Sequence, residues 1–182
     1  MALTNEVDYH FGRIIAHLKA TGQYENIVII VTADHGEMLG DHHGWGKMHY
    51  FDAAFRIPLI IRVPGRGTAG THLSAPTESI DITPTILDLL ELSIPDSMDG
   101  LSIPDSMDGR SLMPLMDAQL PDDWRRFTIS ELDFGDPVTP TPWQTALGLK
   151  SDQCNLSVLR DERHTLVQFG GGLPPILFDH HG

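Results

Sequence analysis

The chain has 182 residues, of which 41% are hydrophobic and 20% are charged, a composition typical of a soluble globular protein. Its 25 acidic residues outnumber its 12 lysines and arginines, and the formal net charge of −13 excludes a surface that holds nucleic acid or an anionic membrane by bulk electrostatics. No apolar run is long enough to span a bilayer and no leader pattern opens the chain, so we expect a cytoplasmic protein without nucleic-acid or membrane partners.

The first predicted element is a helix with one apolar stripe, formed by Val7, Phe11, Ile14, Ile15 and Leu18. Thr4 is its expected N-cap and Gly22 its expected stop. The β-branched run IVIIVTAD, residues 27–34, then predicts a strand buried on both faces, as in a parallel sheet flanked by helices. Helix, short link and buried strand together favour the α/β class.

A second strand and a second helix come next. The run RIPLIIRVPG, residues 56–65, indicates another buried strand, which a proline and a glycine close. Residues 79–92 are a predicted helix with apolar residues on one face. Pro84 falls near the first turn of this helix, where the lack of an N–H does least harm.

Shorter strands are predicted toward the C-terminus. They are FTISELDF, NLSVLRD and ERHTLVQF, at residues 127–134, 155–161 and 162–169. Arg160–Arg163 indicates a charged hairpin turn, and PVTPTPW, residues 137–143, reads as a proline-rich loop. This part of the chain therefore has the character of a small β-rich lobe.

A domain boundary is predicted near Pro121. Residues 1–120 would form the α/β part, and residues 121–182 the smaller β-rich lobe. The nonapeptide LSIPDSMDG occurs at residues 92–100 and again, identically, at 101–109. Two copies are too few for a solenoid, so we interpret the repeat as a duplication tolerated in a surface loop.

The polar stretch TADHGEMLGDHHGWGKMHY, residues 32–50, follows the first predicted strand. In α/β sheets, ligands bind beyond the carboxyl ends of the strands, where loops converge. Asp34 and His35 stand at that position, and an adjacent carboxylate and imidazole can ligate one divalent ion. Such pairs also occur as plain loop or capping residues, so composition alone leaves both interpretations open.

Other residues of this stretch have alternative readings as well. The compact charge of Lys47 suits a phosphoryl or sulfuryl oxygen, although most lysines are solvated surface residues. His42, His43 and His49 can serve as ligands, as acid–base groups or as loop histidines, and for each one taken singly we favour the loop histidine.

The segment VTADHGEMLGDHHGWGKMHYFDAAFRIPLIIRVPG, residues 31–65, resembles the sulfatases and phosphonate monoester hydrolases of the alkaline phosphatase superfamily. In that family a strand ends in Ser/Thr-x-Asp-His-Gly-Glu, and Leu-Gly-Asp-His, Trp-Gly-Lys and an aromatic–aspartate step follow. The resemblance continues in sequence order through SIDITPTILDLL, IPDSMDGRSLMPLM, ISELDF and LPPILFD. It implies an α/β fold in which a partial alkaline phosphatase-like sheet, flanked by helices, precedes a smaller β-rich lobe.

The resemblance also implies site residues. Asp34 and His35 match two ligands of a divalent metal ion, with Mn, Ca, Fe, Mg and Zn as candidates. Lys47 matches a lysine that contacts the transferring sulfuryl or phosphoryl group, so it is the expected catalytic and substrate-binding residue. His49 has no matched role and is kept as a candidate substrate-binding residue. The implied substrates are sulfate or phosphonate/phosphate monoesters.

Parts of the family pattern are not found in this sequence. The nucleophile motif Cys/Ser-x-Pro-Ser/Ala-Arg, the first-strand aspartates and a further histidine belong to an N-terminal half. Cys154 lies in DQCNL, without the proline and arginine of the motif, so we expect a buried structural thiol. We therefore interpret the chain as the C-terminal part of a hydrolase. Because a sheet without its first strands exposes an edge and apolar surface, we expect a homo-oligomer or pairing with the N-terminal half.

Two alternatives stay open from sequence. The chain can be a naturally truncated, inactive protein of the same fold that acts as a binding or structural module. An unrelated acidic metal-binding protein is the more remote alternative, because it does not account for the ordered matches.

Overall fold

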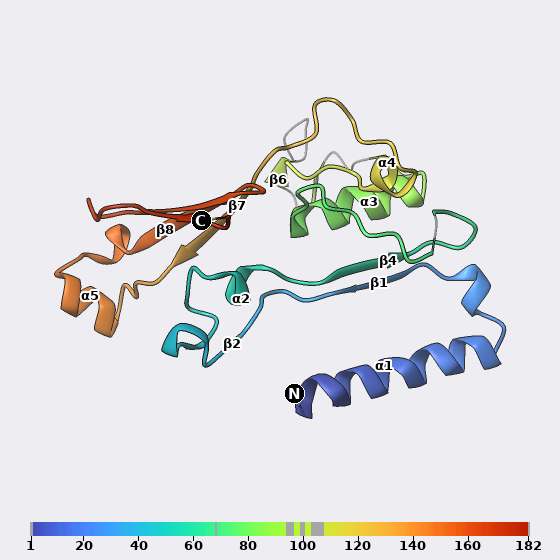
Figure 1. Ribbon diagram of the computed structural model, residues 1–182, viewed down its shortest axis with the longest axis horizontal. Coiled ribbons are helices and arrows are strands. Elements are labelled where there is room, and N and C mark those ends of the chain that lie inside the picture. The colour runs from blue at the N-terminus through green and yellow to red at the C-terminus, as the bar shows by residue number, and fades with distance from the viewer. Residues whose placement is uncertain (1, 68, 94–96, 99–100, 103–107, 182) are drawn as a thin grey trace.

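The structure is a computed structural model that describes residues 2–67, 69–93, 97–98, 101–102 and 108–181. Figure 1 shows helix α1 (Ala2–Ala20) on one side of a ribbon of strands β1 (Ile29–Thr32) and β4 (Leu59–Arg62), and helices α3 (Ile82–Leu89) and α4 (Met113–Met116) on the other side. Strands β7 to β10 form a separate sheet at one end. This mixture of helices and strands, with a strand-rich C-terminal part, confirms the predicted α/β fold class with a smaller β-rich lobe.

Helix α1 ends as predicted but begins earlier. Gly22 adopts φ +71°, its N–H bonds to the carbonyl of Lys19, and the N–H of Gln23 bonds to the carbonyl of Leu18. This is the left-handed stop that glycine permits. Thr4 is not the N-cap, because Ala2 and Leu3, both good helix formers, are already helical. In the described part of the chain, no helix combines the length and apolar character needed to cross a bilayer.

Strands β1 and β4 pair antiparallel, from Ile29 opposite Arg62 to Thr32 opposite Leu59. The expectation of a parallel sheet around a strand buried on both faces is therefore wrong for the described residues. The residues of β1 are at most half-buried, and Ile60 of β4 is 62% exposed. An apolar run indicates that a strand can be buried on both faces, but it carries no information on the direction of the neighbouring strand.

A compact loop region connects β1 to β4. It contains the two-residue strands β2 (Met38–Leu39) and β3 (Trp45–Gly46), which pair with each other, and helix α2 (Asp52–Phe55). Gly36 fixes its beginning, because the Gly36 N–H donates to the carbonyl of Ala54 over 2.8 Å. A Cβ on Gly36 would lie 2.0 Å from the carbonyl oxygen of Ala53, so only glycine fits there.

The C-terminal sheet is antiparallel in the order β10-β9-β8-β7. Its strands are β7 (Thr128–Asp133), β8 (Asn155–Arg160), β9 (His164–Phe169) and β10 (Ile176–Asp179). The predicted strands and the hairpin turn before β9 are confirmed, and β10 is an addition. The predicted proline-rich loop is correct only to Thr141, where a capping box with Gln144 starts helix α5 (Pro142–Leu147).

Two hydrophobic clusters hold these parts. One joins Leu112, Leu115 and Trp124 to half-buried side chains of β4. The other joins Leu156, Val158 and Val167 of the C-terminal sheet to further half-buried residues, among them Tyr50 and Phe55. The loop region before β4 therefore packs on the C-terminal sheet. The division into residues 1–120 and 121–182 stays a prediction.

The repeat is described only in part. Ser97–Met98 (β5) and Leu101–Ser102 (β6) pair antiparallel across the junction between its copies. Most of residues 92–109 lie outside the described range, and so does the predicted surface position of the repeat.

A fully buried carboxylate, Asp81, ties the helical layer to the C-terminal sheet. Its Oδ1 accepts from the Arg110 N–H and from Nη2 of Arg125, and its Oδ2 accepts from the Glu78 N–H and from Nη1 of Arg125, all within 2.6–2.8 Å. Glu78 also pairs with Arg125 over 2.6 Å, and its other carboxylate oxygen accepts from the N–H of Ile129 in β7. Every oxygen of the buried group thus has partners.

Replacing Asp81 with alanine is expected to lower the free energy of unfolding by about 3–5 kcal/mol, because Arg125 would stay buried without its main partner. The matched control is Asp123→Ala, since Asp123 also pairs with an arginine but is 79% exposed. We expect the control to cost less than about 1 kcal/mol. Urea denaturation of both variants measures the difference, and equal losses would contradict the role of Asp81.

Substituting Gly36 with alanine is expected to cost about 1–3 kcal/mol of stability, because the new methyl group meets backbone rather than a side chain that can move. Gly12→Ala is the control, since nothing lies within 4 Å of a Cβ there and Gly12 is inside α1. The control is expected to stabilise by up to about 1 kcal/mol. The same denaturation measurement tests both, and a harmless Gly36→Ala variant would refute the close packing.

Candidate functional site

Asp34 and His35 lie directly after β1, and the structure brings their side chains together. The His35 Nδ1 lies 2.7 Å from the carbonyl oxygen of Gly36. Because a carbonyl can only accept, Nδ1 carries the proton, and in the neutral ring Nε2 keeps its lone pair. This Nε2 lies 3.6 Å from Oδ2 of Asp34. The Asp34 carboxylate is positioned in turn by its Oδ1, which accepts from the His35 N–H over 3.0 Å.

This geometry fits a pair of ligands to one divalent ion. Two atoms bound to one ion at about 2.1 Å each lie about 3–4 Å apart, depending on the angle between them. A ring whose other nitrogen donates to a backbone carbonyl is also the usual form of a metal-bound histidine. The Asp34 side chain is 88% exposed and that of His35 is 37% exposed, so an ion can reach both.

The pair supplies only part of a coordination shell. Within the described ranges, no group of three or more His, Cys, Asp and Glu side chains is placed to hold a metal ion. Divalent ions usually take about four to six ligands or more, so the other positions would fall to water or to groups outside these residues. The pair is therefore compatible with two ligands of the predicted metal, and its binding stays a prediction.

Lys47 follows β3 and is exposed. No hydrogen bond or ion pair of its side chain to another described residue is found, and nothing joins it to Asp34 or His35. Its ammonium group can therefore meet an anionic ligand without giving up an existing partner. The structure neither brings Lys47 to the metal pair nor removes it from reach, and its predicted role stays a prediction.

His49 packs within the loop region. A Cβ on the buried Gly44 would lie 2.7 Å from Nε2 of His49, so the imidazole covers the backbone of Gly44. The ring also lies near that of Phe51, with centroids 6.2 Å apart. These contacts give His49 a packing role, while its predicted contact with substrate remains a prediction.

Cys154 is confirmed as a buried thiol, with no exposed surface. Burial raises the pKa of this thiol, and the nearby carboxylate of Asp152 raises it further. A neutral, inaccessible thiol cannot act as a nucleophile, in keeping with the sequence around it.

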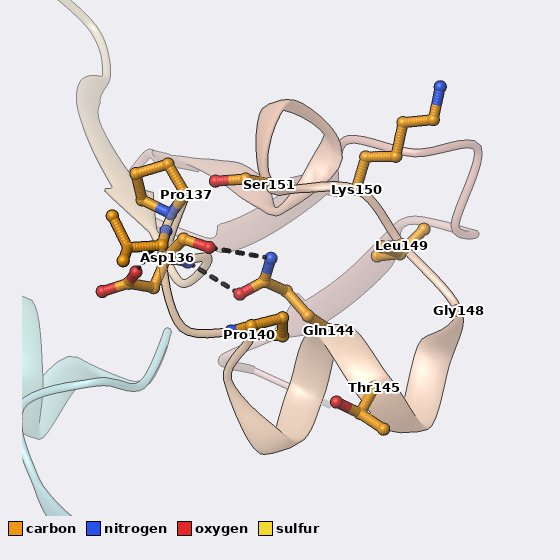
Figure 2. A pocket seen from close by; sticks show the side chains of 10 residues that line it. Asp136, Pro137, Pro140, Gln144, Thr145, Gly148, Leu149, Lys150 and Ser151 are labelled. Carbon is orange, nitrogen blue, oxygen red and sulfur yellow. Dashed lines mark hydrogen bonds between the residues drawn. The ribbon is translucent and has the colours of Figure 1, made fainter.

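One pocket of the described residues lies away from this site. A pocket of about 420 Å³ lies between the 136–140 loop and α5, and Figure 2 shows that Gln144 bridges its wall. The Gln144 amide donates to the carbonyl of Asp136 and accepts from its N–H. The N–H groups of Val138 and Thr139 bond to the Asp136 carboxylate and hold its pKa below the usual range. These polar groups satisfy one another, and none of the predicted site residues lines the pocket.

Two supporting residues escaped the sequence reasoning. Gly36 anchors the metal pair to α2, and Phe51 stacks on His42 with ring centroids 3.9 Å apart. The glycine in Asp-His-Gly and the aromatic–aspartate step were visible in the motif. Their contacts depend on how the loop folds, which the motif does not state.

Known proteins match nearly all of this chain. The sulfatase family model matches residues 2–92. The multifunctional alkaline phosphatase superfamily protein PehA of Trinickia caryophylli is 42% identical over 97% of this chain and 32% of its own length. The phosphonate monoester hydrolase of Silicibacter pomeroyi superposes with a TM-score of 0.87 at 52% identity, over 97% of this chain and 33% of its own. That of Agrobacterium radiobacter superposes with a TM-score of 0.84 at 41% identity, over 96% of this chain and 33% of its own.

These comparisons bear on fold and family. They confirm the predicted resemblance and an alkaline phosphatase-like architecture for the sheets. The chain spans about a third of the length of the relatives it matches. From the family model and the identity to these relatives, we conclude that the chain belongs to the sulfatase family.

Proposed function

We propose that this chain forms part of the active site of a metal-dependent hydrolase that cleaves sulfate or phosphonate/phosphate monoesters. The observation that carries the proposal is the Asp34–His35 pair, whose Oδ2 and Nε2 atoms lie 3.6 Å apart inside the family motif. Relatives named as phosphonate monoester hydrolases and as sulfatases support the reaction class.

In this proposal Asp34 Oδ2 and His35 Nε2 would hold the ion. When bound, a divalent metal supplies Lewis-acid polarisation of an ester oxygen or of a nucleophile. Lys47 would donate to an oxygen of the transferring group and stabilise the negative charge that develops there. The nucleophile and the remaining ligands would come from polypeptide outside this chain.

An inactive module of the same fold is the second candidate. It is favoured by the absence of the nucleophile motif from the sequence and by the two-ligand donor set of the described residues. Turnover of an aryl sulfate or a phenylphosphonate ester, measured with the chain joined to an N-terminal half of the fold, decides between them. Hydrolysis above that of a Lys47→Ala variant would argue against the inactive module.

Metal binding tests the part of the site that this chain holds. Asp34→Ala is expected to weaken Mn²⁺ binding at least about tenfold, because even the loss of a group that supports a ligand costs that much. Asp8→Ala in α1 is the matched control, since Asp8 is exposed and outside the motif. Titration calorimetry of the 182-residue chain measures both, and an unchanged Mn²⁺ affinity in Asp34→Ala would reject the assignment.

We further propose that the chain associates through α1, with itself or with an N-terminal half of the fold. Leu3, Val7 and Ile14 of α1 are 77%, 68% and 56% exposed, and they recur on one side of the helix. Exposed apolar stripes of this kind mark association surfaces.

Light scattering of the isolated chain is expected to give a mass above 20.1 kDa, because no other polypeptide is present to cover the stripe. Replacing Val7 and Ile14 with serine is expected to shift the mass toward the monomer. Serine at Ala16, an exposed position of the same helix, is the control. A monomeric wild-type chain would contradict self-association and leave the N-terminal half as the partner to test by co-expression.

A further inference from the structure

The loop between β2 and β3 holds an unusual backbone. His42 and His43 both adopt left-handed conformations, with φ of 50° and 59°. Non-glycine residues are uncommon at positive φ, although asparagine, aspartate and histidine occur there several-fold more often than other residues. Local strain of this kind is concentrated near functional sites. Lys47 lies four residues after His43.

One of the two histidines has such a contact. The imidazole of His42 stacks on the ring of Phe51, with centroids 3.9 Å apart and planes 13° apart. His43 has the same residue type and a similar backbone, but no hydrogen bond or ring contact of its side chain is found within the described residues. Of the two histidines, only His42 has, within the described part of the chain, a side-chain contact that joins the loop to a residue at the start of α2.

Phe51 is itself held firmly. Its ring lies 4.7 Å from that of Tyr50 and 6.1 Å, edge to face, from that of Phe178 in the C-terminal sheet. Phe51 also immediately precedes α2, the helix that accepts the N–H of Gly36 next to the metal pair. The Phe51 ring, on which His42 stacks, is therefore next to α2. The same helix anchors the Asp34–His35 segment through Gly36.

Lys47 lies between two contacts that close the loop. On one side His42 is stacked on Phe51, and on the other His49 covers Gly44. The carbonyl of Lys47 also accepts from the N–H of His49 over 2.8 Å. Loss of the stack would free the 40–46 segment to move relative to α2 and would carry Lys47 with it.

We propose that His42 is a positioning residue, whose stack on Phe51 fixes the 40–46 loop against α2 and so sets the position of Lys47 relative to the Asp34–His35 pair. Lys47 would bind a sulfuryl or phosphoryl oxygen only if the proposed function is correct, so any effect of His42 on that binding rests on the proposed function. The effect of His42 on the position of the loop does not.

The test compares variants of the full chain. His42→Asn removes the ring but tolerates the left-handed backbone, and His42→Phe keeps a ring that can stack. His43→Asn is the matched control, with the same substitution one residue away. His42→Gly removes the ring and relieves the backbone, so it serves as a second loss variant if His42→Asn does not fold.

The first readout is the initial rate at which trypsin cuts the Lys47–Met48 bond, identified by mass spectrometry, with the Lys150–Ser151 bond as internal reference. We expect His42→Asn to be cut about two- to tenfold faster at Lys47 alone, as the energy of one aromatic stack implies. His42→Phe and His43→Asn are expected to match wild type. Equal rates for His42→Asn and His43→Asn would overturn the proposal.

The second readout is the affinity for inorganic sulfate in the presence of Mn²⁺, with Lys47→Ala as reference. His42→Asn is expected to weaken sulfate binding by about two- to tenfold, as for the cleavage rate. His42→Phe is expected to bind sulfate as the wild type does. If Lys47→Ala weakens binding but His42→Asn does not, the positioning role is overturned. If Lys47→Ala changes nothing, the proposed function of Lys47 fails, and the cleavage rates still decide whether the stack holds the loop.

Discussion

The buried carboxylate of Asp81 is the interaction on which the arrangement of this protein depends. An ionised group without solvent is stable only when donors replace its water, and Asp81 has donors on both oxygens. These donors come from Glu78, four residues before α3, and from Arg110 and Arg125, which are distant in sequence. The neighbouring Glu78 accepts from β7, so the same cluster also sets where the C-terminal sheet begins.

The C-terminal sheet in turn supports the candidate site. Asp52 at the start of α2 forms an ion pair with Arg160 of β8, and Tyr50 and Phe55 pack on the core of that sheet. Helix α2 then holds Gly36, and Gly36 orients His35 through its carbonyl. A β-rich lobe without predicted site residues of its own thus determines the geometry of residues that come more than a hundred positions earlier in the chain.

The site explains why a family member can carry a recognisable motif and still hold only a share of the chemistry. In the proposed function Asp34 and His35 would hold an ion, but the Lewis acidity of a metal is useful only where a nucleophile and substrate meet it. Lys47 is exposed and has no ion-pair partner among the described residues, so its charge would likewise serve catalysis only when a substrate is bound. In the proposed function each of these groups would act with components outside this chain, which spans about a third of the length of the matched relatives.

The sequence by itself determined most of the helices and strands, and it predicted Asp34 and His35 as the candidate metal ligands. The apolar period of α1, the β-branched run of β1 and the alternation of β7 to β9 are properties of neighbouring residues, and so is the spacing of Asp34, His35 and Lys47 in the motif. Only the tertiary structure decided the antiparallel pairing of β1, the start of α5 inside a proline-rich segment, and the stack of His42 on Phe51. It also decided that Asp81 is buried. The physical reason is common to all of these features: each depends on atoms brought together by folding, and local sequence constrains the conformation of a segment but not its partners.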